Sequence, residues 1–280
     1  MRILIAGLGY IGLALADKLV DAGHEVVGLK RNVNLLRPVR YQVVSCDLAA
    51  GALDLDIGHI DAVVCLLAAD EHTDIAYERT YVRAPKNLIA LVKRTGVGAI
   101  PFIYVSSTAV YGQNDGSFVS EDSETVPKGF NGRRLLEGES ISLQSEYRGI
   151  VMRFGGIYGP GRLWPITSVT KQGQGEWHGG SFLNLIHRDD CVGGLYHLIK
   201  LPDADGVFNG VDNEPVTKAV LSDWIAKSIR VPDREPSGQP IVLMNKRCLN
   251  RKLRDTGYSF QYPTFREGLA PLLAEFAVRK

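Results

Sequence analysis

Long apolar runs are absent from this sequence, and so are runs of one charge. No stretch reaches the roughly 20 apolar residues that a membrane-spanning helix needs. The 32 basic and 31 acidic residues nearly cancel, so we expect neither a nucleic acid nor a membrane surface as partner. With 45% hydrophobic and 22% charged residues in 280, the chain has the composition of a globular protein large enough to bury its own core.

Cysteine is also scarce, and its spacing excludes two kinds of site. The four cysteines lie far apart and form no C-x-x-C pair: Cys46, Cys65, Cys191 and Cys248. This spacing indicates neither a zinc site nor a disulfide framework, and it favours a reduced, cytoplasmic setting. The six histidines are scattered as well, so we expect no bound metal.

The N-terminus admits two interpretations. Residues 3–16, ILIAGLGYIGLALA, follow Arg2 and end in Ala-Leu-Ala, which imitates a signal peptide and its cleavage site. The other interpretation is a buried strand, a glycine turn and the apolar start of a helix. We prefer the second, because the three glycines fall at a spacing that secretion does not require.

Short apolar runs alternate with longer helical patterns through the first half of the chain. The predicted strands are rich in Val and Ile and apolar on both faces: Arg2–Ala6, Glu25–Leu29, Gln42–Ser45, Ala62–Leu67, Ile100–Ser106 and Ile150–Phe154. The predicted helices between them are Tyr10–Ala22, Tyr77–Thr95 and Gly132–Tyr147. This alternation predicts an α/β fold with a doubly wound parallel sheet of the Rossmann type. Only 12 residues separate the second and third strands, so that crossover should lack a full helix.

Beyond about residue 155 the pattern becomes richer in Gly, Pro and Trp. A helix over Asp189–Leu201 and a strand over Gly206–Gly210 are expected to return to the main sheet. We therefore predict a dinucleotide-binding domain over 1–159, joined by 187–211, and a smaller mixed C-terminal lobe over 160–186 and 212–280. Arg162, Trp164, Trp177 and His178 lie where this substrate lobe would close over a ligand, or they form its own core.

The first glycine turn is the strongest functional signal. Gly7-Leu8-Gly9-Tyr10-Ile11-Gly12 is a G-x-G-x-x-G pattern that directly follows an apolar strand and directly precedes a helix. Gly7 permits the tight turn, Gly9 lets the backbone approach a pyrophosphate, and Gly12 lets the helix pack on the strand. The helix N-terminus adds N–H groups and a positive dipole. The turn predicts a site for NAD or NADP.

The end of the second strand bears on the choice between these cofactors. An acidic residue there would bind the ribose 2′-hydroxyl of NAD. The strand instead continues into Lys30 and Arg31, which are suited to the 2′-phosphate of NADP. The alternative is that both are solvated surface charges. We expect NAD or NADP, and the two basic residues favour NADP.

Several further motifs, in order along nearly the whole chain, resemble the extended short-chain dehydrogenase/reductase family, which includes NAD-dependent sugar-nucleotide epimerases and dehydratases. The matching segments are Asp47-Leu48 (D-L, adenine contact), Leu66-Leu67-Ala68-Ala69 (H-L-A-A), Val82 to Leu88 (N-V-x-G-T-x-N-L, with Val82, Asn87 and Leu88 kept), Val105 to Gly112 (V-S-S-x-x-V-Y-G), Arg153 with Ile157 to Gly161, and Ile186 to Asp190 (I-H-V-D-D). The resemblance implies a nicotinamide cofactor, a small-molecule substrate such as a sugar-nucleotide, and a homodimer formed through helices of the main domain.

Two departures from the family pattern stand out. Ala6 replaces the first glycine of the usual G-x-x-G-x-x-G. The catalytic Tyr-x-x-x-Lys is missing: on the pattern Y-G-x-S-K-x-x-x-E, Asn131 replaces Tyr and Leu135 replaces Lys. A shift by one residue gives Phe130 and Arg134, which still lacks the phenol. An amide cannot replace a phenol as an acid, and arginine stays protonated.

The resemblance leaves two candidate catalytic residues. Ser107 aligns with the family's catalytic Ser/Thr, which hydrogen-bonds the reacting oxygen; the alternative is a serine that satisfies the backbone at a strand end. Tyr111 is a phenol nearby and a candidate substitute acid, although its family counterpart lines the pocket. Tyr196 and Lys200 form the only Tyr-x-x-x-Lys of the chain, but they follow the sixth strand, and we expect Tyr196 to serve packing.

Two function classes remain open at this point. The first is an NAD(P)-dependent oxidoreductase or epimerase/dehydratase-like enzyme with a non-standard proton-transferring group. The second is a non-catalytic NAD(P)-binding redox sensor or regulatory protein, which would keep the glycine turn and lose the pair. The enzyme is favoured because Ser107, Tyr111 and a second lobe are retained.

Overall fold

A seven-stranded sheet forms the centre of the fold. The computed structural model describes residues 1–35, 37–51, 53–172, 180–229 and 245–278. The strands of the sheet are β1 (Arg2–Ala6), β2 (Glu25–Lys30), β3 (Gln42–Ser45), β4 (Ala62–Cys65), β5 (Pro101–Ser107), β7 (Arg148–Phe154) and β11 (Gly206–Gly210). Their order is β11-β7-β5-β4-β1-β2-β3, and the pairings from β5 through β4, β1 and β2 to β3 are all parallel.

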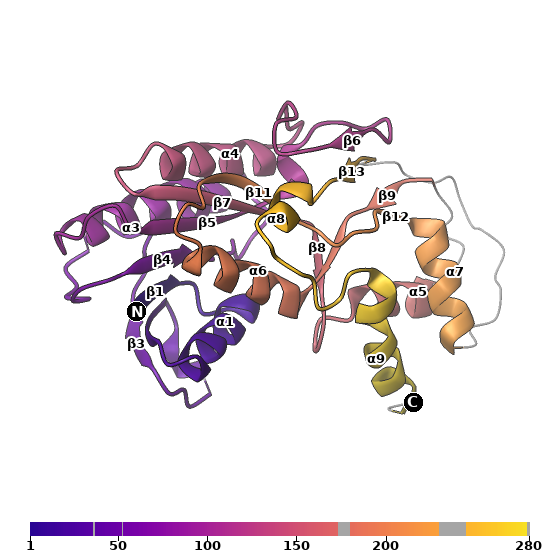
Figure 1. Cartoon of the computed structure of the whole chain (residues 1–280), viewed down its shortest axis with the longest axis horizontal. Helices are drawn as coiled ribbons and strands as arrows, with labels where there is room; N and C mark the ends of the chain where they lie inside the picture. Colours follow the sequence, from indigo (N-terminus) through magenta and orange to yellow (C-terminus); the bar gives the residue numbers. More distant parts are fainter. Residues whose placement is uncertain (36, 52, 173–179, 230–244, 279–280) are drawn as a thin grey trace. The chain divides into compact units, whose positions relative to one another are not determined.

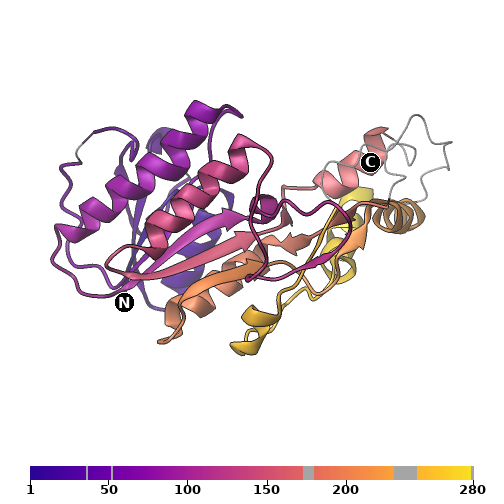
Figure 2. The same ribbon diagram turned by 90° about the horizontal axis from the view of Figure 1, so that it is seen from above.

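Helices cover both faces of this sheet, as Figures 1 and 2 show. Helices α3 (Ala84–Lys93) and α4 (Phe130–Leu143) lie on one face, and α1 (Tyr10–Asp21) and α6 (Arg188–Lys200) lie on the other. A short helix α2 (Asp74–Glu78) runs through the π-helical segment η2 (Arg79–Arg83) into α3. The 3-10 turns η1 (Val33–Leu35) and η3 (Thr108–Val110) complete this part of the chain. The doubly wound Rossmann-type fold predicted from the sequence is confirmed.

The strands form a sheet covered on both faces because their side chains are apolar on both faces. In β4 all four residues are buried, and in β1 only Arg2 is partly exposed. Leu4, Val63 and Phe102, from three neighbouring strands, have exposed fractions of 0% and share one core cluster with Leu88 and Leu91 of α3. This layer of buried apolar residues fixes the strand ends from which the site is built.

The strand order reverses beside β1, which is where such folds bind ligands. From β1 the chain builds β2 and β3 on one side and β4, β5 and β7 on the other. A crevice therefore opens beyond the carboxyl ends of β1 and β4. The first glycine turn follows β1, directly at this reversal.

Most predicted elements are confirmed, and the differences are local. The strands β1, β3 and β11 have the predicted bounds, and only η1 lies in the described part of the crossover between β2 and β3. The prediction that the fourth strand runs to Leu67 was wrong, because β4 ends at Cys65. The single helix predicted over Tyr77–Thr95 was also wrong. It starts earlier, at Asp74, because Thr73 accepts a hydrogen bond from the Ala76 amide as its N-cap, and η2 interrupts it.

The chain divides into two compact units. The first contains Met1–Val110, Val126–Arg153 and Val192–Phe208, and the second contains Tyr111–Thr125, Phe154–Cys191 and Asn209–Lys280. The elements of the second unit are β6 (Phe118–Val119), β8 (Gly156–Tyr158), α5 (Trp164–Gln172), β9 (Phe182–Leu183), β10 (Leu185–His187), β12 (Val216–Thr217), α7 (Lys218–Ile229), β13 (Arg247–Cys248), α8 (Arg251–Asp255) and α9 (Phe265–Val278). The described helices include none that is both long and apolar enough to span a membrane.

Candidate cofactor and catalytic site

The glycine turn has the geometry that its sequence predicts. Gly7 has φ +107°, and a Cβ atom there would collide with the carbonyl oxygen of Leu66. A Cβ atom on Gly12 would collide with the carbonyl oxygen of Gly7, so helix α1 packs against the turn at the closest possible distance. A Cβ atom on Gly9 would meet nothing within 4 Å. Gly7 and Gly12 are therefore needed by the fold, whereas Gly9 leaves open space beside the exposed backbone.

The end of β2 holds this turn in place. The Gly7 amide donates to the Leu29 carbonyl at 3.0 Å, and Lys30 Nζ donates to the Leu8 carbonyl at 3.0 Å. The side chain of Leu8 is 1% exposed and occupies the space that a Cβ atom of Gly28 would need. Gly28 is thus a further residue of the site's framework that sequence reasoning missed, although a glycine within an apolar strand is a usual signal of close approach.

The first turn of α1 is suited to an anion. The N-cap residue is Gly9, which has no side chain to cap the helix, and the first turn carries no acidic residue. The first N–H groups of an α-helix have no intrahelical partner, and together with the helix dipole they attract negative charge. The open space at Gly9 therefore lies beside a set of backbone donors suited to a pyrophosphate.

A pocket of about 780 Å³ extends from this turn across the ends of β2 and β4 to α2, a volume typical of a cofactor site. Predicted cofactor residues that line it are Gly7, Gly9, Lys30, Arg31, Asp47, Leu48, Leu67 and Ala68. The other four predicted residues, Tyr10, Ile11, Gly12 and Ala69, are not among its lining. Residues that sequence reasoning missed include Asn32, Cys46, Asp70, Glu71, Thr73, Arg79 and Thr80.

Charged side chains of both signs meet at this pocket. Arg31 donates two hydrogen bonds to Asp70, at 2.6 and 2.7 Å, and Arg79 Nη2 lies 3.3 Å from Asp47 Oδ2. The Arg31 guanidinium beside Asp70 holds the pKa of that carboxyl below its usual value. Lys30 is the third lining cation and Glu71 the third lining carboxylate, so the formal charges of the lining cancel.

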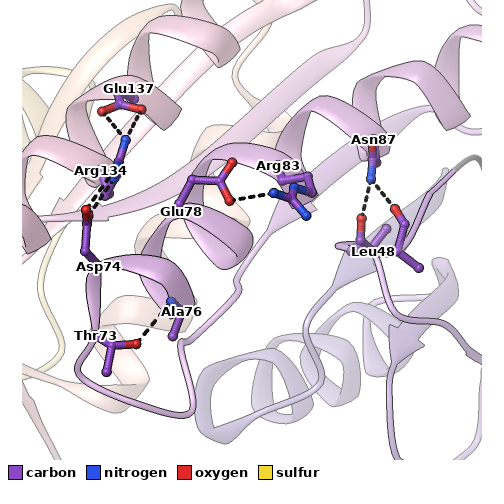
Figure 3. Close-up of polar contacts among 10 residues, drawn as sticks. Leu48, Thr73, Asp74, Ala76, Glu78, Arg83, Asn87, Arg134 and Glu137 are labelled. Carbon is purple, nitrogen blue, oxygen red and sulfur yellow. Dashed lines mark hydrogen bonds and ion pairs between the residues drawn. The ribbon is translucent and has the colours of Figure 1, made fainter.

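The loop after β3 is held in place by a residue of the matching segment Val82 to Leu88. Asn87 Nδ2 on α3 donates to the carbonyls of Leu48 and Ala50, at 2.8 and 2.7 Å, as Figure 3 shows. Asp47 accepts from the Ala49 amide at 3.0 Å within the same loop. Asn87 therefore acts by positioning Asp47 and Leu48 at the pocket.

Helix α4 provides no proton-transferring group at the predicted positions. Leu135 is 5% exposed and packs inward. Arg134 donates to Asp74, with contacts of 2.7 and 3.0 Å, and to both carboxylate oxygens of Glu137, as Figure 3 shows. In one alignment the helix thus has the amide of Asn131 and the aliphatic chain of Leu135 at the two positions. In the other it has the ring of Phe130 and the paired guanidinium of Arg134.

The same helix is nevertheless fixed firmly against the sheet. Glu139 on α4 is 3% exposed, and it accepts from Ser106 at 2.5 Å and from Arg153 at 3.0 and 2.6 Å. A Cβ atom on Gly132 would lie 2.9 Å from the carbonyl oxygen of Ala109, so the first turn of α4 lies against the loop that follows β5. These contacts fix α4 against β5, β7 and the loop that follows β5.

The two predicted catalytic residues have different surroundings. Ser107 ends β5 half-buried, and its hydroxyl accepts from the Ala109 amide at 3.2 Å. Tyr111, in the second unit, is 2% exposed, and its hydroxyl donates to Asn209 Oδ1 at 2.9 Å. A role of Tyr111 as an acid would require this buried hydrogen bond to break.

The remaining sequence candidates have different surroundings. The ring of Tyr196 lies near Lys18 and His24, at the end of α1 remote from the glycine turn, as expected for a packing residue. Trp164 donates to the Ile157 carbonyl at 2.9 Å and packs against the core of the second unit. Arg162 is exposed, and Trp177 and His178 fall outside the described residues.

Known proteins share both the motifs and the fold of this chain. The sequence model of the NAD dependent epimerase/dehydratase family matches residues 3–209. The protein YeeZ of Escherichia coli (strain K12) is 26% identical over 94% of this chain and 96% of its own length.

Solved structures, among them the following two, also match over the full length of the chain. The first, from Methylobacillus flagellatus and assigned there to the NAD-dependent epimerases/dehydratases, is 31% identical, with a TM-score of 0.81 over 100% of this chain and 99% of its own. The second, MoeE5 in complex with UDP-glucuronic acid and NAD, has a TM-score of 0.83 at 22% identity over 100% of both chains. The family model matches residues 3–209, which contain the glycine turn, the matching segments after β4 and β5, and α4. The chain therefore belongs to the NAD dependent epimerase/dehydratase family.

Proposed function

We propose that this chain is an NAD(P)-dependent oxidoreductase or epimerase/dehydratase-like enzyme that acts on a carbonyl or sugar-nucleotide substrate. The observation that carries the proposal is the pocket beyond β1, β2 and β4, where Gly9 leaves open space beside the N-terminus of α1. A bound nicotinamide cofactor would supply the hydride donor or acceptor, while the protein supplies binding and orientation.

The pocket and the segments next to it would each hold one part of this cofactor or its substrate. Gly7, Gly9 and the first turn of α1, with Tyr10, Ile11 and Gly12, would hold the pyrophosphate. Asp47 and Leu48 would meet the adenine, and the strand-end residues Leu67, Ala68 and Ala69 would line the path toward the nicotinamide. Ser107, at the end of β5, would hold the reacting oxygen. We assign the cofactor site to 1–159 with 187–211, and the substrate lobe to 160–186 and 212–280.

Lys30 and Arg31 make NADP the favoured cofactor in this proposal. Both line the pocket at the end of β2, where a carboxylate would select the ribose hydroxyl of NAD. Arg31 is paired with the exposed carboxylate of Asp70, and exposed ion pairs contribute about 0.2–1 kcal/mol. A 2′-phosphate could replace Asp70 as the partner of Arg31 at little cost.

The substrate class rests on the related structure that holds UDP-glucuronic acid and NAD. One experiment tests cofactor and substrate together. Purified protein is titrated with NAD and NADP by calorimetry and then incubated with UDP-glucuronic acid, UDP-glucose and small aldehydes. We expect binding of at least one cofactor and slow turnover of at least one probe. Failure to bind either cofactor would refute the proposal.

A non-catalytic redox sensor is the second candidate. The observation that favours it is that α4 offers no acid or base at Asn131, Leu135, Phe130 or Arg134. Losing a general acid costs about 10²–10⁴ in rate, which a sensor would tolerate. Tight cofactor binding without turnover of any probe would favour the sensor over the enzyme.

A further inference from the structure

We propose that Tyr77 and His72 form a proton-transferring pair beside the first turn of α4, a role that rests on the proposed enzymatic function. The Tyr77 hydroxyl lies 3.4 Å from His72 Nδ1. This distance is long for a hydrogen bond, as is common for catalytic contacts before a ligand binds. A phenol beside an imidazole is the arrangement that passes a proton from a buried site toward solvent.

Both side chains pack against the first residue of α4. The ring centroids of Phe130 lie 5.0 Å from those of His72 and 5.4 Å from those of Tyr77, and the His72 and Tyr77 centroids are 5.4 Å apart. Two of these three contacts are edge-to-face, the favoured geometry for aromatic rings. Helix α2 thus brings a phenol, and the loop before it an imidazole, to the first turn of α4, where the predicted position Asn131 holds no acid or base.

An ion pair holds α2 at this place. Asp74, the first residue of α2, accepts two hydrogen bonds from Arg134 of α4, and Thr73 caps the helix by accepting from the Ala76 amide at 3.2 Å, as Figure 3 shows. The fork-to-carboxylate geometry fixes direction as well as distance. Arg134 therefore acts as a positioning residue, because it fixes the helix that carries Tyr77.

Residues next to this pair in the sequence line the pocket, whereas Tyr77 and His72 are not among its lining. Glu71 and Thr73, on either side of His72, line it, and so do Ala76 and Thr80, which precede and follow Tyr77. His72 is exposed and Tyr77 is half-buried. The imidazole can therefore exchange protons with water while the phenol is partly shielded.

Two other phenols are poorer candidates for this role. Tyr81 accepts a hydrogen bond from the Ala69 amide at 3.4 Å, but burial raises the pKa of its hydroxyl. Tyr111 is 2% exposed, and its hydroxyl donates a hydrogen bond to Asn209 Oδ1. Tyr77 combines partial exposure with a neighbouring base.

The proposed step balances in both directions. In alcohol oxidation the proton of the substrate hydroxyl passes to the Tyr77 oxygen while the Tyr77 proton passes to neutral His72 at Nδ1. The substrate C–H bond breaks, and its electron pair leaves with the hydrogen as hydride to the oxidised nicotinamide cofactor, so that the substrate becomes a carbonyl. His72 then releases one proton to water. In carbonyl reduction each transfer runs in reverse.

The test compares Tyr77→Phe and His72→Gln with Tyr196→Phe, a tyrosine at the remote end of α1. Cofactor affinity is measured by calorimetry, turnover with UDP-glucuronic acid and small aldehydes as probes, and the ring nitrogens of His72 by 15N NMR. We expect Tyr77→Phe to lower kcat about 10²–10⁴-fold while KM and cofactor affinity change less than about threefold. We also expect it to move the Nδ1 resonance of His72, whereas Tyr196→Phe changes nothing.

The proposal is overturned if Tyr77→Phe keeps full turnover, or if the Nδ1 resonance of His72 is the same with and without the Tyr77 hydroxyl. The NMR measurement needs neither substrate nor cofactor, so it can refute the pair even when no probe turns over. Failure of the proposed function is seen separately, as absence of heat on titration with both NAD and NADP.

Discussion

Arg31, directly after β2, and Asp70, in the loop after β4, form a bidentate ion pair of 2.6 and 2.7 Å beside the glycine turn. The pair lines the pocket, and its side chains are 54% and 65% exposed. Because a 2′-phosphate and the Asp70 carboxylate would compete for Arg31, the choice between NADP and NAD depends on this pair.

Asp70→Asn should therefore tighten NADP binding and leave NAD binding nearly unchanged. An exposed pair contributes up to about 1 kcal/mol, which corresponds to a gain of up to about fivefold. Arg31→Ala should weaken NADP selectively, and NADP affinity should fall as salt rises. Calorimetry with both cofactors checks this. The idea would be defeated if NAD and NADP bound the unmodified protein with equal affinity and if both affinities changed in parallel in the Asp70 and Arg31 variants.

Restoring the missing pair gives a second prediction. Asn131→Tyr with Leu135→Lys places a phenol and an amine one helical turn apart on α4. We expect turnover of small carbonyl probes to rise, by about 10²-fold where the pocket admits them. Since Leu135 is 5% exposed, the double variant should also lose about 2–4 kcal/mol of unfolding free energy.

The matched control is Asn131→Phe with Leu135→Lys, which lacks only the hydroxyl. It should lose similar stability and gain no turnover. A rate gain in both double variants would show that the phenol is not the cause.

Cys46 offers a direct probe of the pocket. It lines the pocket and is half-buried, whereas Cys65, Cys191 and Cys248 have exposed fractions of 1% or less. Burial raises the pKa of the Cys46 thiol, and it raises that of Cys65 to about 12. Because the thiolate is the reactive form, alkylation of Cys46 should be slow near neutral pH and accelerate as pH rises.

A bound cofactor should protect Cys46. At a concentration of about ten times Kd, NAD(P) should slow its alkylation by iodoacetamide about tenfold, with Cys46→Ser as the control for assignment. Mass spectrometry of the modified peptides measures this. Modification of another cysteine first, or an equal rate with and without cofactor, would contradict the location of the site.

His187 in the second unit predicts how stability depends on pH. It is 2% exposed, its Nδ1 accepts from the Asp189 amide at 3.1 Å, and burial lowers its pKa from 6.5 to about 4. The unfolded chain therefore binds this proton at a higher pH than the folded chain does. The contribution of neutral His187 is fully present above about pH 6.5 and is lost as pH falls from there to about 4.

Urea unfolding across this pH range measures the effect. His187→Gln should be less stable at neutral pH but show a flatter decline between about pH 6.5 and 4. A decline of the same steepness in both proteins would show that other groups cause it.

The first βα unit could be predicted from the sequence because its signals are local. The apolar strand, the three glycines and the helix start follow one another within 3–16, and the structure has β1, the turn and α1 at these positions. The family and the doubly wound sheet were likewise predicted, since short motifs such as Val105 to Gly112 lie at strand ends.

The partners across the pocket could not be predicted, because they come from distant parts of the chain. Asp70 lies 39 residues from Arg31, and Arg79 lies 32 residues from Asp47. The N-cap at Thr73 was a local signal that could have been found. The π-helical segment η2, in contrast, lies where the carbonyl of Tyr81 accepts from Tyr104 at 3.2 Å, a contact made only in the folded protein.

The most direct test of the central claim is calorimetric titration of the unmodified protein and of Gly9→Ala with NAD and NADP. A Cβ atom at Gly9 meets no protein atom within 4 Å, whereas it would occupy space next to the N-terminus of α1. We predict that Gly9→Ala keeps the unfolding temperature of the unmodified protein and lowers cofactor affinity about tenfold or more. Unchanged affinity for both cofactors in Gly9→Ala would contradict the account and place the cofactor elsewhere.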